Sequence, residues 1–177
     1  MPETEILKER SELDPNYQWD LRPMYADDAA WEADLAVLEE QIGAMVAFAG
    51  TLRDAESIGA FFDAETELGR RLANLYCYAS MRRSEDTRAE AGQRMYARIT
   101  AKYAQAMAAL SFAEPEILAL PEETLQAAVE DARLADHKFT MQNLLRRKPH
   151  TLSAAEEKLL AAAGEMAQAP DTIFGAM

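Results

Sequence analysis

The chain has 177 residues, a formal net charge of −13 and one cysteine, so it can form a domain with its own core but no intrachain disulfide. Phosphate backbones and anionic membrane surfaces attract basic side chains, so this acidic balance argues against nucleic-acid and membrane partners. The N-terminal residues lack a secretion-signal pattern, and no apolar run approaches the roughly 20 residues that span a bilayer. We therefore expect a cytoplasmic protein.

Composition and periodicity predict an all-helical fold. Only seven glycines and seven prolines interrupt a chain rich in alanine, leucine, glutamate and arginine, and these four are strong helix formers. No stretch alternates apolar and polar residues as a strand would. We predict an irregular segment over 1–26, a bundle of long antiparallel helices over 27–112, and shorter helices over 113–177.

The first long helix is predicted to begin near Asp27 and Asp28, which suit an N-cap and the positive end of a helix. It should end by Gly50. Its apolar residues recur at helical spacing and form one face. That face consists of Trp31, Leu35, Leu38, Ile42, Met45 and Phe48. Side chains that can anchor the preceding segment to the helices are Trp19, Leu21 and Tyr25.

Two further long helices are predicted over about 54–83 and 88–112. The buried stripe of the first comprises Ile58, Phe61, Leu68, Leu72, Leu75 and Ala79. The second should start with a capping box formed by Thr87 and Glu90. It should bury Met95, Ile99, Tyr103, Ala106 and Leu110.

The thiol and the aromatic side chains of these helices are predicted to be core residues. Cys77 lies between apolar neighbours and lacks nearby cationic residues, which favours a buried, unreactive thiol. Helical spacing of the large apolar residues favours core packing over a binding surface. The residues concerned are Trp31, Phe48, Phe61, Phe62, Tyr76, Met95 and Tyr103.

Shorter elements follow residue 112. A break at 114–116 leads into a short apolar turn, and Pro121 should open a helix that ends near Arg133. Another short helix is predicted over 138–147, where Pro149 stops it. A capping box formed by Ser153 and Glu156 then begins a last helix that extends to about Ala167.

The two histidines do not form a recognisable metal or catalytic motif. His137 and His150 lie 13 residues apart, and neither begins a His-Glu-x-x-His sequence. A site built from His137 with Asp136 or Glu130 would lack the spacing typical of zinc ligands. His150 has no partner acid or nucleophile nearby in the sequence, so a loop histidine is favoured over a catalytic one.

Charged clusters are equally open to a structural explanation. Adjacent helical carboxylates point about 100° apart and cannot act as a facing pair. The adjacent pairs are Glu39–Glu40, Glu122–Glu123 and Glu156–Glu157. The basic cluster Arg146, Arg147 and Lys148 could bind an anion or a peptide carboxylate, or could balance the dipole at a helix C-terminus. The sequence assigns no catalytic, metal-binding or substrate-binding residue.

Several motifs resemble the N-terminal region of the oligoendopeptidase F family of zinc metallopeptidases. They are Phe-Ala-Glu-Pro-Glu-Ile-Leu at 112–118, Arg-Lys-Pro-His-Thr-Leu-Ser at 147–153, Glu-Glu-Lys-Leu-Leu-Ala at 156–161, then Glu165 and Ile173-Phe174. Nearer the start, Trp19-Asp20-Leu21, Tyr25 and Trp31 also match. The resemblance spans most of the chain and is most specific over 112–174.

This resemblance implies an all-helical cytoplasmic enzyme that cleaves short peptides inside a channel. Its zinc would be held by a His-Glu-x-x-His helix and a later glutamate, and the motif glutamate would activate the zinc-bound water. The chain ends at Met177, ahead of that helix, so no catalytic or metal residue carries over. We expect an N-terminal lobe that walls the channel, is inactive alone and docks on its own C-terminal catalytic domain.

The alternative is a helical protein- or peptide-binding module without an enzymatic parent. Coding sequence beyond the codon for Met177 would discriminate, since an open frame encoding His-Glu-x-x-His would favour the peptidase. A lobe separated from its partner domain should expose an apolar patch, which predicts self-association of the isolated chain.

Overall fold

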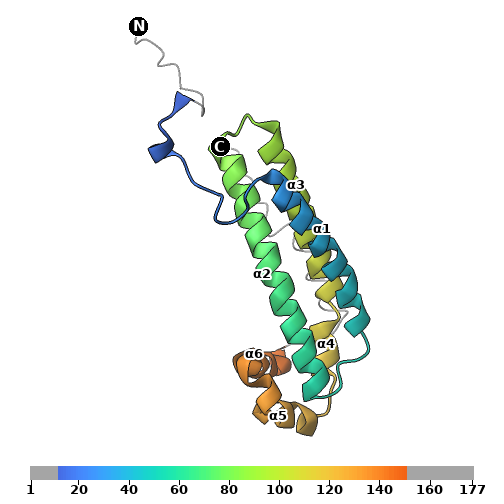
Figure 1. The fold of residues 1–177 in the computed structure, drawn as a ribbon. Helices are drawn as coiled ribbons and strands as arrows, with labels where there is room; N and C mark the ends of the chain where they lie inside the picture. The colour runs from blue at the N-terminus through green and yellow to red at the C-terminus, as the bar shows by residue number, and fades with distance from the viewer. Residues whose placement is uncertain (1–11, 151–177) are drawn as a thin grey trace, which may run out of the picture.

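The computed structural model describes residues 12–150, and this part of the chain contains six α-helices and no strand. The long helices are α1 (Asp28–Met45), α2 (Ala55–Glu85) and α3 (Glu90–Leu110) (Figure 1). The short helices are α4 (Ala113–Leu118), α5 (Glu122–Glu130) and α6 (Lys138–Arg147). Short 3-10 segments cover Pro15–Tyr17, Val46–Phe48, Ala132–His137 and Lys148–His150. The predicted all-helical class, with long helices followed by short ones, is confirmed.

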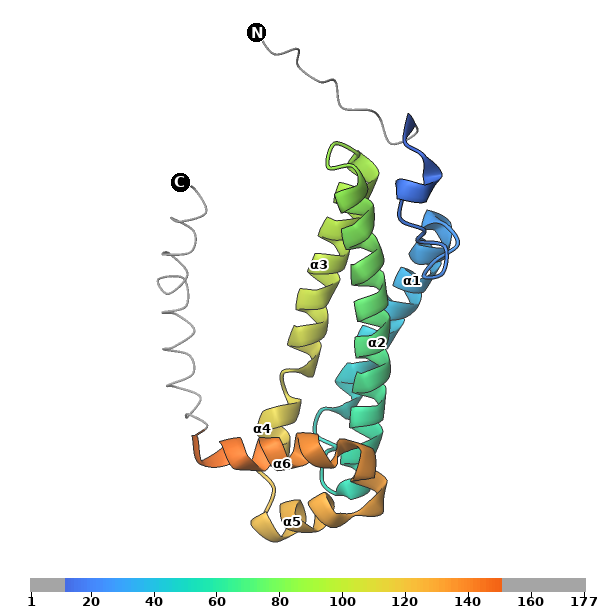
Figure 2. The ribbon, with the colours of Figure 1, turned by 90° about the vertical axis from the view of Figure 1, so that its left-hand side faces the viewer.

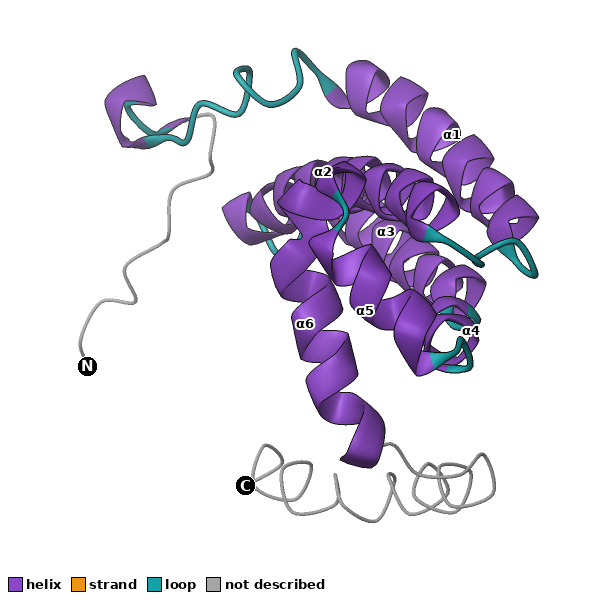
Figure 3. Cartoon of the chain, turned by 90° about the horizontal axis from the view of Figure 1, so that it is seen from below, coloured by secondary structure: helices purple, strands orange, loops and turns teal. Residues whose placement is uncertain are grey.

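The helices form an elongated body with a separate base. α2 and α3 lie side by side as an antiparallel hairpin, and α1 packs along the pair (Figure 2). At 1.5 Å per residue, the 31 residues of α2 span about 46 Å. α5 and α6 lie across the end of the hairpin where α2 begins, as the view from below shows (Figure 3).

Aspartate side chains cap the first two long helices. Asp27 has extended backbone angles and accepts a 2.8 Å hydrogen bond from the Ala30 N–H, as an N-cap should. Asp54 and Ser57 form a capping box at the start of α2. The predicted helix starts are therefore confirmed. α1 ends at Met45, earlier than predicted, because the chain tightens there into a 3-10 turn.

The predicted stripes of α1 and α2 face one continuous core. Trp31 is fully buried, and its indole N–H donates a 2.9 Å hydrogen bond to the Leu75 carbonyl. The largest fully buried side chains are Trp31, Leu35, Leu38, Leu52, Ile58, Phe61, Leu68, Leu75, Ile99, Ile117, Leu125 and Leu134.

Three residues that were predicted to be buried lie at the surface. Cys77 is exposed, and Tyr76 and Tyr103 are 37% and 49% exposed. Cys77 follows the buried Leu75 by two residues, which turns its side chain about 200° away on a helix. Apolar spacing alone therefore assigned too many residues of α2 and α3 to the buried face.

The predicted capping box at the start of α3 is also wrong. α2 continues to Glu85, and Ala89 occupies the N-cap of α3 without a side-chain hydrogen bond. Asp86 forms the connection instead, because its carboxylate accepts a 2.9 Å hydrogen bond from the Arg88 N–H. This local turn competes with capping by Thr87.

The predicted break at 114–116 is a helix. Pro115 lies in the first turn of α4, where a missing N–H costs no helical hydrogen bond. α5 ends at Glu130 rather than near Arg133, because extended Asp131 caps the following 3-10 turn. α6 matches the predicted 138–147. The last predicted helix and its Ser153–Glu156 capping box lie outside the described residues.

Candidate functional site

The Glu-Pro-Glu motif connects α4 to the turn between α1 and α2. The carboxylate of Glu116 accepts hydrogen bonds from the backbone N–H groups of Gly50, at 2.8 Å, and Leu52, at 2.7 Å. Gly50 has a φ of 78°, a left-handed conformation that glycine adopts without strain. Since charged hydrogen bonds are stronger than neutral ones, Glu116 holds this turn firmly on α4.

The basic cluster at the end of α6 contacts the same region. Arg147 forms an ion pair with Glu114 of α4. The Lys148 ammonium lies 3.5 Å from the Leu120 carbonyl oxygen and 3.9 Å from the Glu122 carboxylate. Two of the three cations thus join α6 to α4 and α5, which supports a structural role over capture of an external anion.

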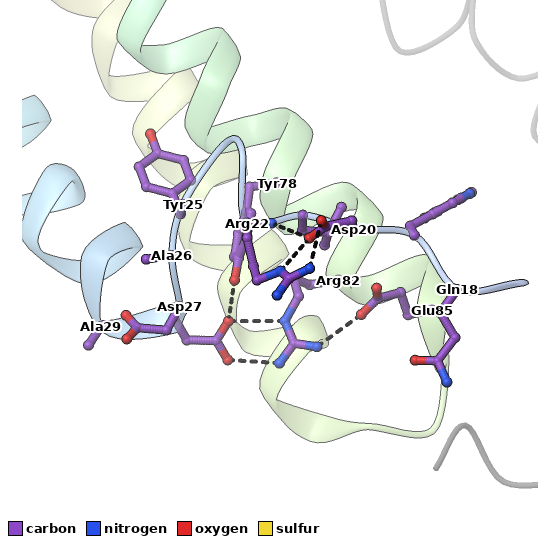
Figure 4. A pocket seen from close by; sticks show the side chains of 13 residues that line it. Gln18, Asp20, Arg22, Tyr25, Ala26, Asp27, Ala29, Tyr78, Arg82 and Glu85 are labelled. Atoms are coloured by element: carbon purple, nitrogen blue, oxygen red, sulfur yellow. Dashed lines mark hydrogen bonds and ion pairs between the residues drawn. The ribbon is translucent and has the colours of Figure 1, made fainter. Parts of the chain in front are cut away.

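Four of the other matching residues, Trp19, Asp20, Leu21 and Tyr25, line an open hollow at the opposite end of the hairpin. Its volume is about 720 Å³, and its walls are residues 18–22 and 25–29 together with Tyr78, Arg82 and Glu85 of α2 (Figure 4). Trp19 lines it and is 56% exposed. We take this hollow as the candidate site.

A single guanidinium organises this hollow. Arg82 donates from Nε and Nη2 to the two carboxylate oxygens of Asp28, at 3.0 and 2.8 Å, and from Nη1 to Glu85 at 2.9 Å. The Tyr78 hydroxyl donates to Asp28 at 2.8 Å. Arg82 lowers the pKa of Asp28, whereas burial, with the Asp28 carboxylate nearby, raises the pKa of Tyr78 to about 12.

A second carboxylate anchors the N-terminal segment beside this group. The Tyr25 hydroxyl donates to Asp34 at 2.6 Å, and Arg71 Nε donates to the other oxygen of Asp34 at 2.8 Å. Burial raises the pKa of Tyr25. Its ring meets that of Tyr78 edge-on at 5.2 Å, so the two networks form one structure.

The geometry favours a structural role for this network. Nε, Nη1 and Nη2 of Arg82 all donate to carboxylates of the chain itself, so three of its five N–H groups already have an internal partner. Sequence reasoning missed the site because Asp28 and Arg82 lie 54 residues apart. The available signal was the i, i+4 spacing of Tyr78 and Arg82, which places both on one face of α2.

The described residues do not fit a zinc site. No three His, Cys, Asp or Glu side chains within 12–150 converge on a point where a metal ion could bind. His137 lies 2.8 Å from Asp63 and packs on the Phe62 ring, whereas Glu130 pairs with Lys138. His137 and Glu130 thus have separate partners, and we assign no step to a metal among the described residues. The side chain of His150 lies outside the described residues.

None of the helices in the described part is both long and apolar enough to cross a membrane.

Comparison with known proteins identifies relatives of the chain. A family model described as Oligopeptidase F matches residues 116–177. The group B oligopeptidase PepB of Streptococcus agalactiae is 38% identical over 171 residues, which cover 94% of this chain and 27% of PepB. The oligopeptidase PepF of Bacillus subtilis is 30% identical over 177 residues, which cover 97% of this chain and 26% of PepF.

A solved structure shares the fold. The crystal structure of a putative peptidase from Chlamydophila abortus matches with a TM-score of 0.79 and 26% identity, over 94% of this chain and 29% of that chain. The chain thus spans roughly a quarter of the length of each relative it matches. By sequence and by fold, the chain is similar to the N-terminal region of the oligoendopeptidase F peptidases.

Proposed function

We propose that the chain is the N-terminal lobe of a zinc-dependent endopeptidase that hydrolyses short peptides. The observation that carries this proposal is the match of 94% of the chain to only 27% of PepB, an oligopeptidase by name. In this proposal, the lobe walls the channel in which peptides are cleaved. The zinc ligands and the catalytic glutamate lie outside the chain, and the enzyme acts in the cytoplasm.

The geometry of the described residues favours a structural wall over a reactive centre. α2 is about 46 Å long and is tied along its length to α1, so it can resist bending. Arg71 and Arg82 lie at the two ends of the stretch 71–82 of α2, and each pairs with a carboxylate of α1. Asp28, which lines the hollow, and Asp34, which belongs to the neighbouring network, are both occupied by arginine and tyrosine donors.

A hybrid enzyme tests the proposal. The matching quarter of Streptococcus agalactiae PepB is replaced by this chain, and hydrolysis of a short fluorogenic peptide is measured for the hybrid, for PepB and for the isolated chain. We expect the hybrid to hydrolyse the peptide in a chelator-sensitive manner, and the isolated chain to be inactive. Chelator-sensitive hydrolysis by the isolated chain, or a folded hybrid without activity, would refute the proposal.

A further inference from the structure

The middle of the α2–α3 hairpin has charged side chains on one side only. Over residues 71–82 of α2 these are Arg71 and Arg82, and each pairs with an aspartate of α1 at 2.8 Å. Over residues 95–110 of α3 the charged side chains are Arg98, which pairs with Glu32, and Lys102, which pairs with Glu39 at 3.0 Å. All four cations thus reach toward α1, so the face turned away from α1 is uncharged over about 18 Å of α2 and about 24 Å of α3. The two uncharged stretches meet where Tyr76 lies beside Tyr96.

This uncharged face is aromatic and methyl-rich. Tyr76 and Tyr96 join their hydroxyls at 2.9 Å, with ring centroids 5.5 Å apart, and tie α2 to α3 along it. Tyr103 and Met107 continue the row on α3 and are 49% and 45% exposed. The Thr100 hydroxyl, between Tyr96 and Tyr103, donates to the Tyr96 carbonyl of its own helix, so its hydrogen bond is satisfied within α3.

A row of this kind is typical of a surface that another protein element covers. The centres of protein interfaces are enriched in tyrosine and methionine and depleted in charged residues. Elsewhere the chain is strongly charged, with 28% Asp, Glu, Lys and Arg and a net charge of −13. This net negative charge would repel a second, equally acidic copy of the chain wherever the contact extended beyond the uncharged face.

We infer that this uncharged face of α2 and α3 is the surface by which the lobe docks on the remainder of the peptidase. The inference rests on the proposed function. Each relative has about three-quarters of its length outside the matched region, so ample polypeptide is available to cover the face. The complementary surface should be apolar at its centre and acidic at its edge, where Arg83 stacks on Tyr96, 4.5 Å from the ring centroid.

Two threonines provide a matched labelling test. Thr100 is exposed on the uncharged face, and Thr66 is exposed on α2 among the charged residues Asp63, Glu67 and Arg70. With the native thiol removed by Cys77→Ser, and any cysteine of the PepB part of the hybrid replaced by serine, Thr100→Cys and Thr66→Cys each introduce one reactive site. Labelling by a polyethylene-glycol maleimide is timed in the isolated chain and in the hybrid with PepB.

We expect the Thr100→Cys thiol to react at least tenfold more slowly in the hybrid than in the isolated chain, and the Thr66→Cys thiol to change by less than twofold. Equal labelling rates at Thr100→Cys in both proteins, or equal slowing at both positions, would overturn the inference. An active hybrid would still uphold the proposed function. Slow labelling of the Thr100→Cys thiol already in the isolated chain would overturn the inference, because residues 151–177 would then cover the face. If that slow labelling depended on protein concentration, a second copy would cover it instead. A folded but inactive hybrid would refute both proposals.

Discussion

The aromatic cluster at the base of the α2–α3 hairpin and the Arg82 network at its other end are different kinds of contact. At the base, Phe61 meets the rings of Phe48, Phe62 and Phe112 at centroid distances of 5.6 to 5.8 Å, in surroundings without a charged partner. At the other end, Arg82 joins carboxylates of α1 and α2. Apolar packing is insensitive to pH and to salt, whereas ion pairs at a partly open surface respond to both.

Removal of Phe61 should produce the largest effect. Phe61 is 1% exposed and lies at the centre of the aromatic cluster, so Phe61→Ala should lower the free energy of unfolding by about 3–5 kcal/mol. The matched control is Phe139→Ala, because Phe139 is 76% exposed and should change stability by less than about 0.5 kcal/mol. Urea denaturation followed by circular dichroism measures both. Similar losses in the two variants would contradict the assigned role of the base, and Phe61→Leu provides a milder variant if Phe61→Ala fails to fold.

A pair of glycine variants should sharpen the comparison at the other end. A Cβ at Gly92 would lie 2.8 Å from the Arg82 carbonyl oxygen and 2.9 Å from Arg83 Cα, backbone atoms that cannot rotate away. Gly92→Ala should therefore cost about 1–3 kcal/mol. Gly69→Ala meets nothing within 4 Å and should stabilise the helix by up to about 1 kcal/mol. Thermal unfolding midpoints should shift in opposite directions, and a common direction would count against the close approach of α2 and α3.

Loss of the guanidinium should have an intermediate effect that depends on salt. Arg82→Met removes the guanidinium that pairs with Asp28 and Glu85, and we expect a loss of about 1–2 kcal/mol after allowance for the partial exposure of the group. Arg70→Met, at an exposed ion pair with Glu67, should cost less than about 0.5 kcal/mol. Urea midpoints at low and high salt measure both. An Arg82→Met effect no larger than that of Arg70→Met would show that the network contributes little.

The pH dependence above pH 10 should show the smallest effect. The pKa of Tyr78 is raised to about 12 in the folded chain, against about 10 for an unfolded tyrosine. The stabilisation from its neutral hydroxyl is therefore complete below pH 10 and is lost as pH rises toward 12. In Tyr78→Phe, the urea midpoint should fall less steeply over that window than in the parent chain. Tyr25 contributes a similar dependence that the variant retains, and parallel slopes would contradict the assignment.

Local signals in the sequence predicted much of the fold. Asp27 and Asp54 cap helices because an aspartate oxygen can reach a free N–H two or three residues on, which needs no tertiary contact. Burial of Leu35 and Leu72 likewise follows from spacing alone. The same spacing misplaced Tyr76 and Tyr103, because periodicity cannot tell the core from an apolar face that nothing in the described part covers.

The candidate site depends on contacts that only the fold creates. Asp28 and Asp27 are chemically identical neighbours, yet one pairs with Arg82 and the other caps α1. The choice depends on where α2 passes α1, and no local pattern contains that information. The Thr87–Glu90 motif failed for a related reason, because Asp86 offers the backbone a competing turn.

The contact between Glu116 and the α1–α2 turn affects the order in which the chain can fold. The N–H groups of Gly50 and Leu52 donate to a carboxylate that follows them in the chain by 66 and 64 residues. During synthesis, α1 and much of α2 can form early from local interactions, but their connection keeps two unsatisfied donors until α4 arrives. The α1–α2 turn should therefore be among the last parts of the three long helices to become fixed, and we expect a low φ-value there when folding rates are measured.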